Sequence, residues 1–180
     1  MSKKSIVKIG NKTLREKAER VYLDKITSPE IQQTIQTMSD TLAATSDGIG
    51  IAAPQIGVPL QIFIASEEAL FERKKDETKN IKHHWKHFVF INPRVVKLSR
   101  KKKEDYEGCL SVPGKYGLVK RAEKITIRAY DEHGMEHTRG ASGLFARLFQ
   151  HEIDHLQGIL FIDKAQKIIT LLDHKKENPV

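Results

Sequence analysis

Two histidines and a glutamate stand near the end of the sequence at a spacing that suits metal chemistry. The segment FQHEIDHLQG, residues 149–158, places His151 and His155 four positions apart, with Glu152 directly after the first histidine. Residues four apart on an α-helix share one face, so both imidazoles can bind the same metal ion. The glutamate can then move protons to and from a water molecule. The segment therefore suggests a metal-dependent hydrolase.

The two histidines continue the apolar face of a helix that we expect over about 142–157. Leu144, Leu148, His151 and His155 follow one another at spacings of 4, 3 and 4, which is typical of one buried stripe. One alternative is a pair of core histidines satisfied by hydrogen bonds. Each buried imidazole, however, has polar nitrogens that need partners. A shared metal ion satisfies both rings at once, so we favour a metal site.

A catalytic metal also needs a third protein ligand and one open coordination position. Downstream of the histidines, Asp163, Asp173 and His174 are isolated residues without a ligand motif. Upstream, Cys109 lies in the segment EGCLSVPG and is the only cysteine of the chain. A lone cysteine is commonly an inert core residue, but a thiolate is a good ligand for zinc and iron. Beside the two histidines, Cys109 is the best third ligand.

The elements that must position these residues begin with a helix over residues 28–45. Ser28 can cap it, and Pro29 suits the first helical position. An apolar stripe at helical spacing follows, formed by Ile31, Ile35, Met38 and Leu42. The next segment, residues 47–59, is rich in glycine and proline and is expected to be a loop.

Strands are expected in the middle of the chain. The segments with strand patterns are residues 60–66, 88–93 and 124–131, with one further strand between 94 and 109. Glu132, His133 and Gly134 should turn the chain, so that residues 135–141 return as a hairpin partner.

Two charged segments complete the chain: a polar excursion at about 67–87 and a basic tail at about 164–180. The tail is expected to include a last helix over about 164–176. Because helices and strands segregate along the sequence, the fold class is α+β. We expect a single catalytic domain over residues 1–180, with small antiparallel or mixed sheets packed around a central metal-bearing helix.

The composition is that of one ordinary domain without membrane contact. The chain has 180 residues, of which 39% are hydrophobic, enough to bury a core. No stretch approaches the roughly 18 consecutive apolar residues of a membrane span, and the start lacks the apolar region of a secretory signal. A single cysteine excludes an internal disulfide. These features predict a cytoplasmic protein.

The chain is basic, with a net charge of +8. Such a balance can reflect a solvated surface or contact with an acidic partner such as the ribosome. The candidate basic segments are residues 74–87, 99–103 and 164–176. The sequence has no aromatic-interleaved motif typical of RNA-binding modules, and nothing in it indicates DNA binding.

Three segments, taken in order and spacing, resemble the signature motifs of the peptide deformylase family. They are GIGIAAPQ (48–55), EGCLS (107–111) and HEIDH (151–155). The resemblance runs from about residue 6 to about residue 165. It implies removal of the N-terminal formyl group from N-formylmethionyl nascent peptides, with release of formate. It also implies one divalent metal ion, Fe2+ in cells, with Zn2+, Ni2+ or Co2+ able to occupy the purified protein.

The resemblance assigns roles to individual residues. Cys109, His151 and His155 would hold the metal, and Glu152 would act as general base and then as general acid. The side chain of Gln55 and the backbone N–H of Leu110 would stabilise the developing oxyanion, and Gly50 would contact the formyl group through its backbone. We expect a further group of residues to bind the substrate: Ile49, Gly50, Leu144 and Leu148.

The sequence leaves open which residues support the metal-binding histidines, and it leaves alternative functions open as well. Asp154 or Glu107 could accept a hydrogen bond from a metal-binding histidine, and Arg121 could support them. The chain has Tyr116 and Lys120 where many members of the family carry arginine and proline. The alternative functions are another zinc-dependent hydrolase, which would not account for the first two motifs, and a catalytically weak deformylase-like protein that binds peptide or the ribosome.

Overall fold

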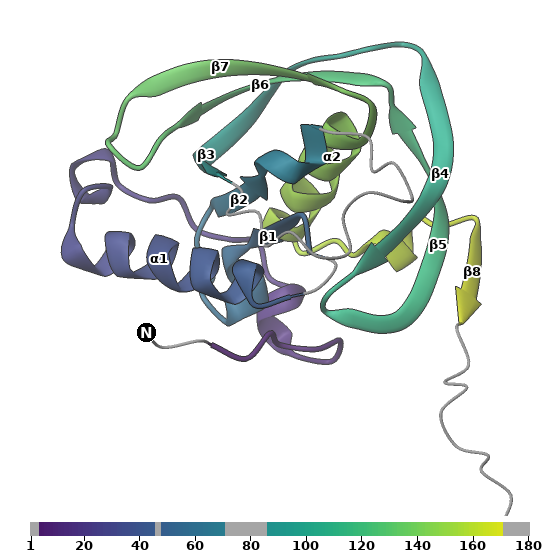
Figure 1. The fold of residues 1–180 in the computed structure, drawn as a ribbon, viewed down its shortest axis with the longest axis horizontal. Coiled ribbons are helices and arrows are strands. Elements are labelled where there is room, and N and C mark those ends of the chain that lie inside the picture. The colour runs from purple at the N-terminus through teal and green to yellow at the C-terminus, as the bar shows by residue number, and fades with distance from the viewer. Residues whose placement is uncertain (1–3, 46–47, 71–85, 171–180) are drawn as a thin grey trace, which may run out of the picture.

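The computed structural model describes residues 4–45, 48–70 and 86–170, and these form two antiparallel sheets and two α-helices (Figure 1). The five-stranded sheet has the order β1 (Gly50–Ala52), β2 (Ile62–Ser66), β3 (His87–Leu98), β6 (Lys124–Tyr130) and β7 (Glu136–Ser142). The three-stranded sheet has the order β4 (Lys102–Cys109), β5 (Val112–Ala122) and β8 (Lys167–Thr170). The helices are α1 (Pro29–Ala43) and α2 (Gly143–Leu156). The α+β class is confirmed.

The first helix forms for the reasons visible in the sequence. The hydroxyl oxygen of Ser28 accepts a hydrogen bond from the backbone N–H of Ile31 at 3.5 Å, and Pro29 occupies the first turn. The expected apolar stripe is buried and packs against the strands β1, β2 and β3. The helix ends at Ala43, where Ala44 caps it.

The segment 47–59 holds more regular structure than the loop we expected. Residues 50–52 form the edge strand β1, which pairs with β2 in antiparallel register from Gly50 opposite Ala65 to Ala52 opposite Phe63. A 3₁₀-helix, Ala53–Ile56, follows directly. Proline does not prevent pairing here because Pro54 and Pro59 both follow the last residue of the strand.

One long strand, β3, replaces the two strands expected between residue 88 and the basic turn at 99–103. Pro93 does not end the strand, because the register with β6 shifts between Ile91 and Arg94. Such a bulge leaves a residue outside the ladder, where a proline needs no hydrogen-bond partner. Asn92 lies within this bulge with a φ of 51°, a backbone region that favours glycine.

The second helix crosses the inner face of the five-stranded sheet (Figure 1). Its apolar side enters an aromatic cluster of Phe63, Phe90, Phe145 and Phe149, in which the ring centroids of Phe63 and Phe90 are 4.7 Å apart. Each such buried ring contributes about 1.5–3 kcal/mol to folding. The packing sets the rotation of α2, and its opposite side faces the strands β4 and β5. The expected hairpin of β6 and β7 is confirmed.

The C-terminal prediction was wrong for the part that the structure describes. Residues 167–170 are the strand β8, not a helix, and pair with β5 from Lys115 opposite Thr170 to Leu118 opposite Lys167. The exposed edge of β5 offers hydrogen-bond partners that a local apolar pattern does not reveal. Residues 171–180 lie outside the described part of the chain. So does most of the excursion, whose first residues form a 3₁₀-helix, Glu67–Leu70.

Three further 3₁₀-helices connect the main elements: Lys12–Leu14, Leu23–Lys25 and Phe161–Asp163. None of the helices among the described residues is long and apolar enough to cross a membrane.

Candidate metal centre and active site

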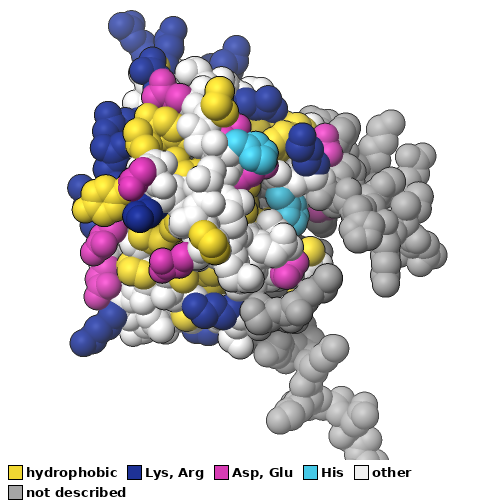
Figure 2. Space-filling model, turned by 90° about the vertical axis from the view of Figure 1, so that its left-hand side faces the viewer, with side chains coloured by type: hydrophobic (Ala, Val, Ile, Leu, Met, Phe, Trp, Pro, Cys, Tyr) yellow, Lys and Arg dark blue, Asp and Glu magenta, His cyan; other side chains and the backbone are white. Residues whose placement is uncertain are grey.

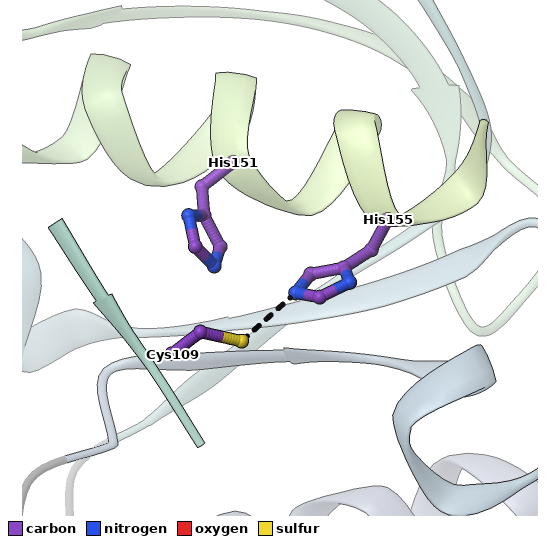
Figure 3. Close-up of side chains that lie close together, drawn as sticks. All are labelled: Cys109, His151 and His155. Carbon is purple, nitrogen blue, oxygen red and sulfur yellow. Dashed lines mark hydrogen bonds between the residues drawn. The ribbon is translucent and has the colours of Figure 1, made fainter. Parts of the chain in front are cut away.

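The fold brings the three proposed ligands together from two elements. Cys109 ends β4, whereas His151 and His155 project from α2 toward it (Figure 3). Their ligand atoms all lie within 4.8 Å of one another, and Cys109 Sγ is 3.2 Å from His155 Nε2. A tetrahedral ion with bonds of about 2.0–2.3 Å requires ligand atoms roughly 3–4 Å apart. One thiol and two imidazoles at this spacing suit a divalent transition metal.

Glu107 is the partner of the first histidine. Its Oε2 lies 3.0 Å from His151 Nδ1, which leaves the other ring nitrogen for a metal. Arg121 donates two hydrogen bonds of 2.9 Å to the same carboxylate. Burial by itself would raise the pKa of Glu107, but the hydrogen bonds from Arg121 and His151 outweigh it and hold that pKa well below its ordinary value. Asp154 instead pairs with Arg121 and Lys164.

The two histidines therefore differ in their surroundings. Burial tends to lower the pKa of His151, yet its interactions with Cys109 and Glu107 raise that pKa to about 10, so binding of a metal to this ring must release its second proton. Burial also lowers the pKa of His155, with the positive charge near His151 acting in the same direction. His155 Nδ1 is buried without a hydrogen-bond partner among the described residues. A neutral imidazole is the form that binds metal, and the lowered pKa keeps His155 in that form.

Glu152 is a buried carboxylic acid next to these ligands. It is 2% exposed, which excludes an ordinary ion pair on the helix surface. Its Oε2 has no hydrogen-bond partner in the part of the chain that the structure describes. Burial raises the pKa of Glu152 to about 7, in spite of the nearby positive charge of His151. A carboxyl group with a pKa near neutrality can both accept and release a proton, as general acid–base chemistry requires.

Gln55 is held so that its amide NH₂ points toward the cysteine. Its Oε1 accepts a hydrogen bond of 2.8 Å from the N–H of Ala52, which fixes the orientation of the amide. Nε2 donates to Ser111 Oγ at 3.3 Å and lies 3.6 Å from Cys109 Sγ. Leu110 follows Cys109 directly. A donor of this kind, already oriented and buried, is what an oxyanion site needs.

A cavity of about 490 Å³ opens onto this cluster. The four expected substrate-binding residues, Ile49, Gly50, Leu144 and Leu148, all line it. A Cβ atom on Gly50 would lie 2.6 Å from Leu148 Cδ1 and 3.0 Å from Glu152 Oε1, so only glycine lets β1 come this close to α2. Leu144, however, is 50% exposed, and its placement in the buried stripe was wrong. It lies in the first turn of α2 and lines the cavity, and the described residues leave half of it exposed.

Tyr116 also lines the cavity and lies over Gly108. A Cβ atom at Gly108 would be 2.9 Å from the Tyr116 ring, so the glycine makes room for the aromatic side chain. The two residues are direct neighbours across β4 and β5.

Ser142 precedes α2 as expected, but its side chain makes no capping hydrogen bond.

Sequence reasoning missed Arg147, a buried residue of α2. Its guanidinium donates hydrogen bonds to Glu107 Oε1 at 2.7 Å and to the carbonyl oxygens of Val119 and Lys103, both at 2.9 Å. It therefore ties the helix that carries the histidines to the strands that lead to Cys109. The sequence contains an indication of this role. Arg147 stands four positions before His151 on the apolar face of the helix, where a charged side chain needs a buried partner.

Comparisons with known proteins agree with this geometry. The family model described as polypeptide deformylase matches residues 3–170. A peptide deformylase of Carboxydothermus hydrogenoformans is 41% identical over 165 residues, which cover 91% of this chain and 94% of that protein. One of Roseiflexus sp. is 38% identical over 159 residues, covering 88% and 85% of the two chains.

Solved structures of deformylases share the fold. A peptide deformylase from Legionella pneumophila superposes with a TM-score of 0.77 and 36% identity, covering 92% of this chain and 87% of its own. A class I type b peptide deformylase from Acinetobacter baumannii gives a TM-score of 0.79 with 29% identity, covering 91% and 99%.

Fold, site and matches together define a metal-dependent hydrolase that cleaves an amide bond. The chain belongs to the peptide deformylase family. It is an enzyme that removes the N-terminal formyl group from newly made polypeptides.

Proposed function

We propose that Cys109, His151 and His155 hold a divalent metal ion and that Glu152 carries the proton transfers of deformylation. The observation that supports this most is the meeting of three ligand atoms within 4.8 Å beside a buried carboxylate with an unpartnered oxygen. When bound, such an ion lowers the pKa of water from 15.7 toward about 7 and polarises the formyl carbonyl.

Glu152 takes a proton from the attacking water and delivers it to the nitrogen of the leaving amine. Its pKa of about 7 suits both steps near neutral pH. The NH₂ of Gln55 and the backbone N–H of Leu110 donate hydrogen bonds to the negative charge that develops on the formyl oxygen as water attacks the formyl carbon. Glu107 keeps the ring of His151 in place through the bond to Nδ1.

The N-formylmethionyl end of a nascent peptide enters the cavity beside β1. Gly50 contacts the formyl group through its backbone, and Ile49, Leu144 and Leu148 supply apolar contacts to the methionine side chain. A class I type b peptide deformylase from Acinetobacter baumannii has been crystallised with Met-Ala-Ser bound, which supports a short peptide as ligand.

The test is formate release from formyl-Met-Ala-Ser by the metal-loaded protein. Cys109→Ala should lose both metal and activity, because the thiolate supplies the only charged ligand. Glu152→Gln should keep the metal and lose most turnover. Stoichiometric metal in Cys109→Ala would remove Cys109 from the ligand set. A protein that binds the peptide but releases no formate would instead be the catalytically weak, deformylase-like alternative.

Fe2+ is the ion that we infer for the cell, with Zn2+, Ni2+ or Co2+ able to replace it. A cysteine with two histidines accepts all four, so the ligand set does not select one. Metal analysis after purification without oxygen tests this. The iron form should also lose activity in air faster than the nickel form, because the cysteine sulfur can be oxidised beside an open position. Equal lifetimes of the iron and nickel forms would argue against iron redox chemistry as the cause of inactivation.

We further infer that the chain works as a single catalytic domain in the cytoplasm. We also infer that its basic side chains contact the ribosome. Lys and Arg side chains lie along the upper and left-hand edges of the face in Figure 2, interrupted by acidic ones. Within the segment 99–103, Lys101 pairs with Glu123 at 3.1 Å, so part of that charge is already neutralised. Ribosome co-sedimentation that weakens steeply with salt would support the contact. A truncation after Thr170 tests the tail while keeping β8.

A further inference from the structure

A second cavity, remote from the catalytic cluster, is lined by three arginines. Arg20, Arg94 and Arg128 surround a space of about 340 Å³ that shares no lining residue with the active-site cavity. All three side chains are exposed. Within residues 4–45, 48–70 and 86–170, none of them makes a hydrogen bond, an ion pair or a ring contact. Three positively charged side chains therefore line one cavity, and no described acidic residue forms an ion pair with them.

Two of these arginines are placed directly against each other by the sheet. Arg94 of β3 and Arg128 of β6 are opposite residues in the antiparallel register. Like charges in opposite positions destabilise a pair of strands. Among the described residues, the only carboxylate lining the cavity belongs to Glu136, which is opposite Tyr130 and forms no ion pair with the arginines. No described acidic side chain therefore offsets this repulsion, whereas a bound anion would.

Arg20 is brought to the same hollow by a specific arrangement of the backbone. Asn92, in the bulge of β3, is 2% exposed and is the one non-glycine residue with positive φ in the described chain. Its Nδ2 donates to the carbonyl of Val21 at 2.7 Å, and its Oδ1 accepts from the N–H of Val21 at 2.9 Å. These two bonds attach the segment that carries Arg20 to the strand that carries Arg94. Unfavourable backbone conformations of this kind cluster where a site must be held in shape.

We propose that this cavity binds a phosphate group through Arg20, Arg94 and Arg128. A guanidinium presents a planar fork of N–H donors that matches two phosphate oxygens. Three such forks, lining one cavity from different segments, can together contact the several oxygens of a phosphate better than the two of a carboxylate. The phosphate can be a free ion or part of an RNA backbone, since both offer the same chemistry.

Binding is measured on the full-length protein with two probes: orthophosphate by calorimetry and a short fluorescent RNA by anisotropy. Arg128→Gln and Arg94→Gln should each weaken binding about tenfold, the loss of one charge-assisted contact. Arg100→Gln removes the same charge from an exposed arginine outside the cavity and should leave affinity within about twofold. Saturation by orthophosphate identifies a site for the small ion. RNA binding that orthophosphate does not displace identifies the backbone of RNA as the source.

A charge reversal provides a second, independent readout. Arg94→Glu should abolish phosphate binding and raise the melting temperature, because the opposed pair becomes attractive. Formate release from a short formyl peptide should stay unchanged in every variant, since no cavity residue lines the active site. The proposal would be overturned if the wild-type protein bound neither orthophosphate nor the RNA. It would also be overturned if Arg100→Gln lost as much affinity as the cavity variants, because binding would then depend on net charge only.

Discussion

Arg147 offers the sharpest test of how the site is held together. Replacing it with methionine keeps a long apolar stem but removes the guanidinium. The change deletes the 2.7 Å bond to Glu107 and the two 2.9 Å bonds to the carbonyl oxygens of Lys103 and Val119. Removing one member of a buried ion pair costs about 3–5 kcal/mol. Because Glu107 keeps both bonds from Arg121, we expect the lower end of that range, about 3 kcal/mol.

For a chain of this size, about 3 kcal/mol corresponds to a fall of roughly 6–12 °C in melting temperature. The consequence should reach the metal as well. Glu107 also orients His151, and loss of such an outer partner typically reduces metal affinity about 10–100-fold. Calorimetry gives the melting temperature, and competition with a chelator gives the metal affinity. Both are measured on the same Arg147→Met protein.

Two further variants separate charge from geometry. Arg147→Lys keeps the positive charge but cannot reach Glu107 and two carbonyls at once, so it should recover only part of both losses. Arg100→Met removes an exposed arginine and should change neither quantity. If Arg147→Met melted within about 1 °C of the parent and held metal equally well, the arginine would not connect the helix to the strands as we argue.

Four other outcomes are expected. Glu152→Gln should retain fold and metal but lose about 10²–10⁴-fold in turnover, measured as formate release. Gln55→Leu should lose about 10²–10³-fold in kcat with little change in metal content; an unaltered rate would exclude Gln55 as an oxyanion donor. Gly158→Ala should destabilise the protein in urea by more than about 1–2 kcal/mol. The glycine has a φ of 73°, and an added Cβ would lie 2.6 Å from the carbonyl oxygen of Arg15. The hydrogen bond from Arg15 lowers the pKa of Asp163, so the pair adds stability above about pH 4 and loses it as the pH falls through the lowered value. Arg15→Ala should flatten this part of an acid-denaturation curve, and an identical curve would contradict it.

The local part of the site could be read from the sequence. His151, Glu152 and His155 keep a fixed relation because helical periodicity alone sets it. The first helix was equally readable, since its cap, its proline and its apolar stripe are all local signals. These features depend on neighbours a few positions away, and such neighbours are present in the unfolded chain too.

Other expectations failed where a distant segment decides the structure. The residues of β8 have an apolar pattern that also fits a helix, but the free edge of β5 pairs with them instead. Leu144 continues the stripe of α2 by spacing, yet it is exposed because no described element lies over the first turn of the helix. Periodicity states which residues share a face of a helix, and it does not state how far the covering layer extends.

The sequence by itself determined the helix that carries two histidines and a glutamate, and it identified a single cysteine as their partner. Only the tertiary structure decided that Cys109 meets His155 across 46 positions of chain, and that Glu107 rather than Asp154 holds His151. It also placed Arg147 between the helix and the strands. The physical reason is that these contacts depend on sheet register and on the pairing of buried charges. Both are set by the packing of α2 against two sheets and not by any local pattern of residues.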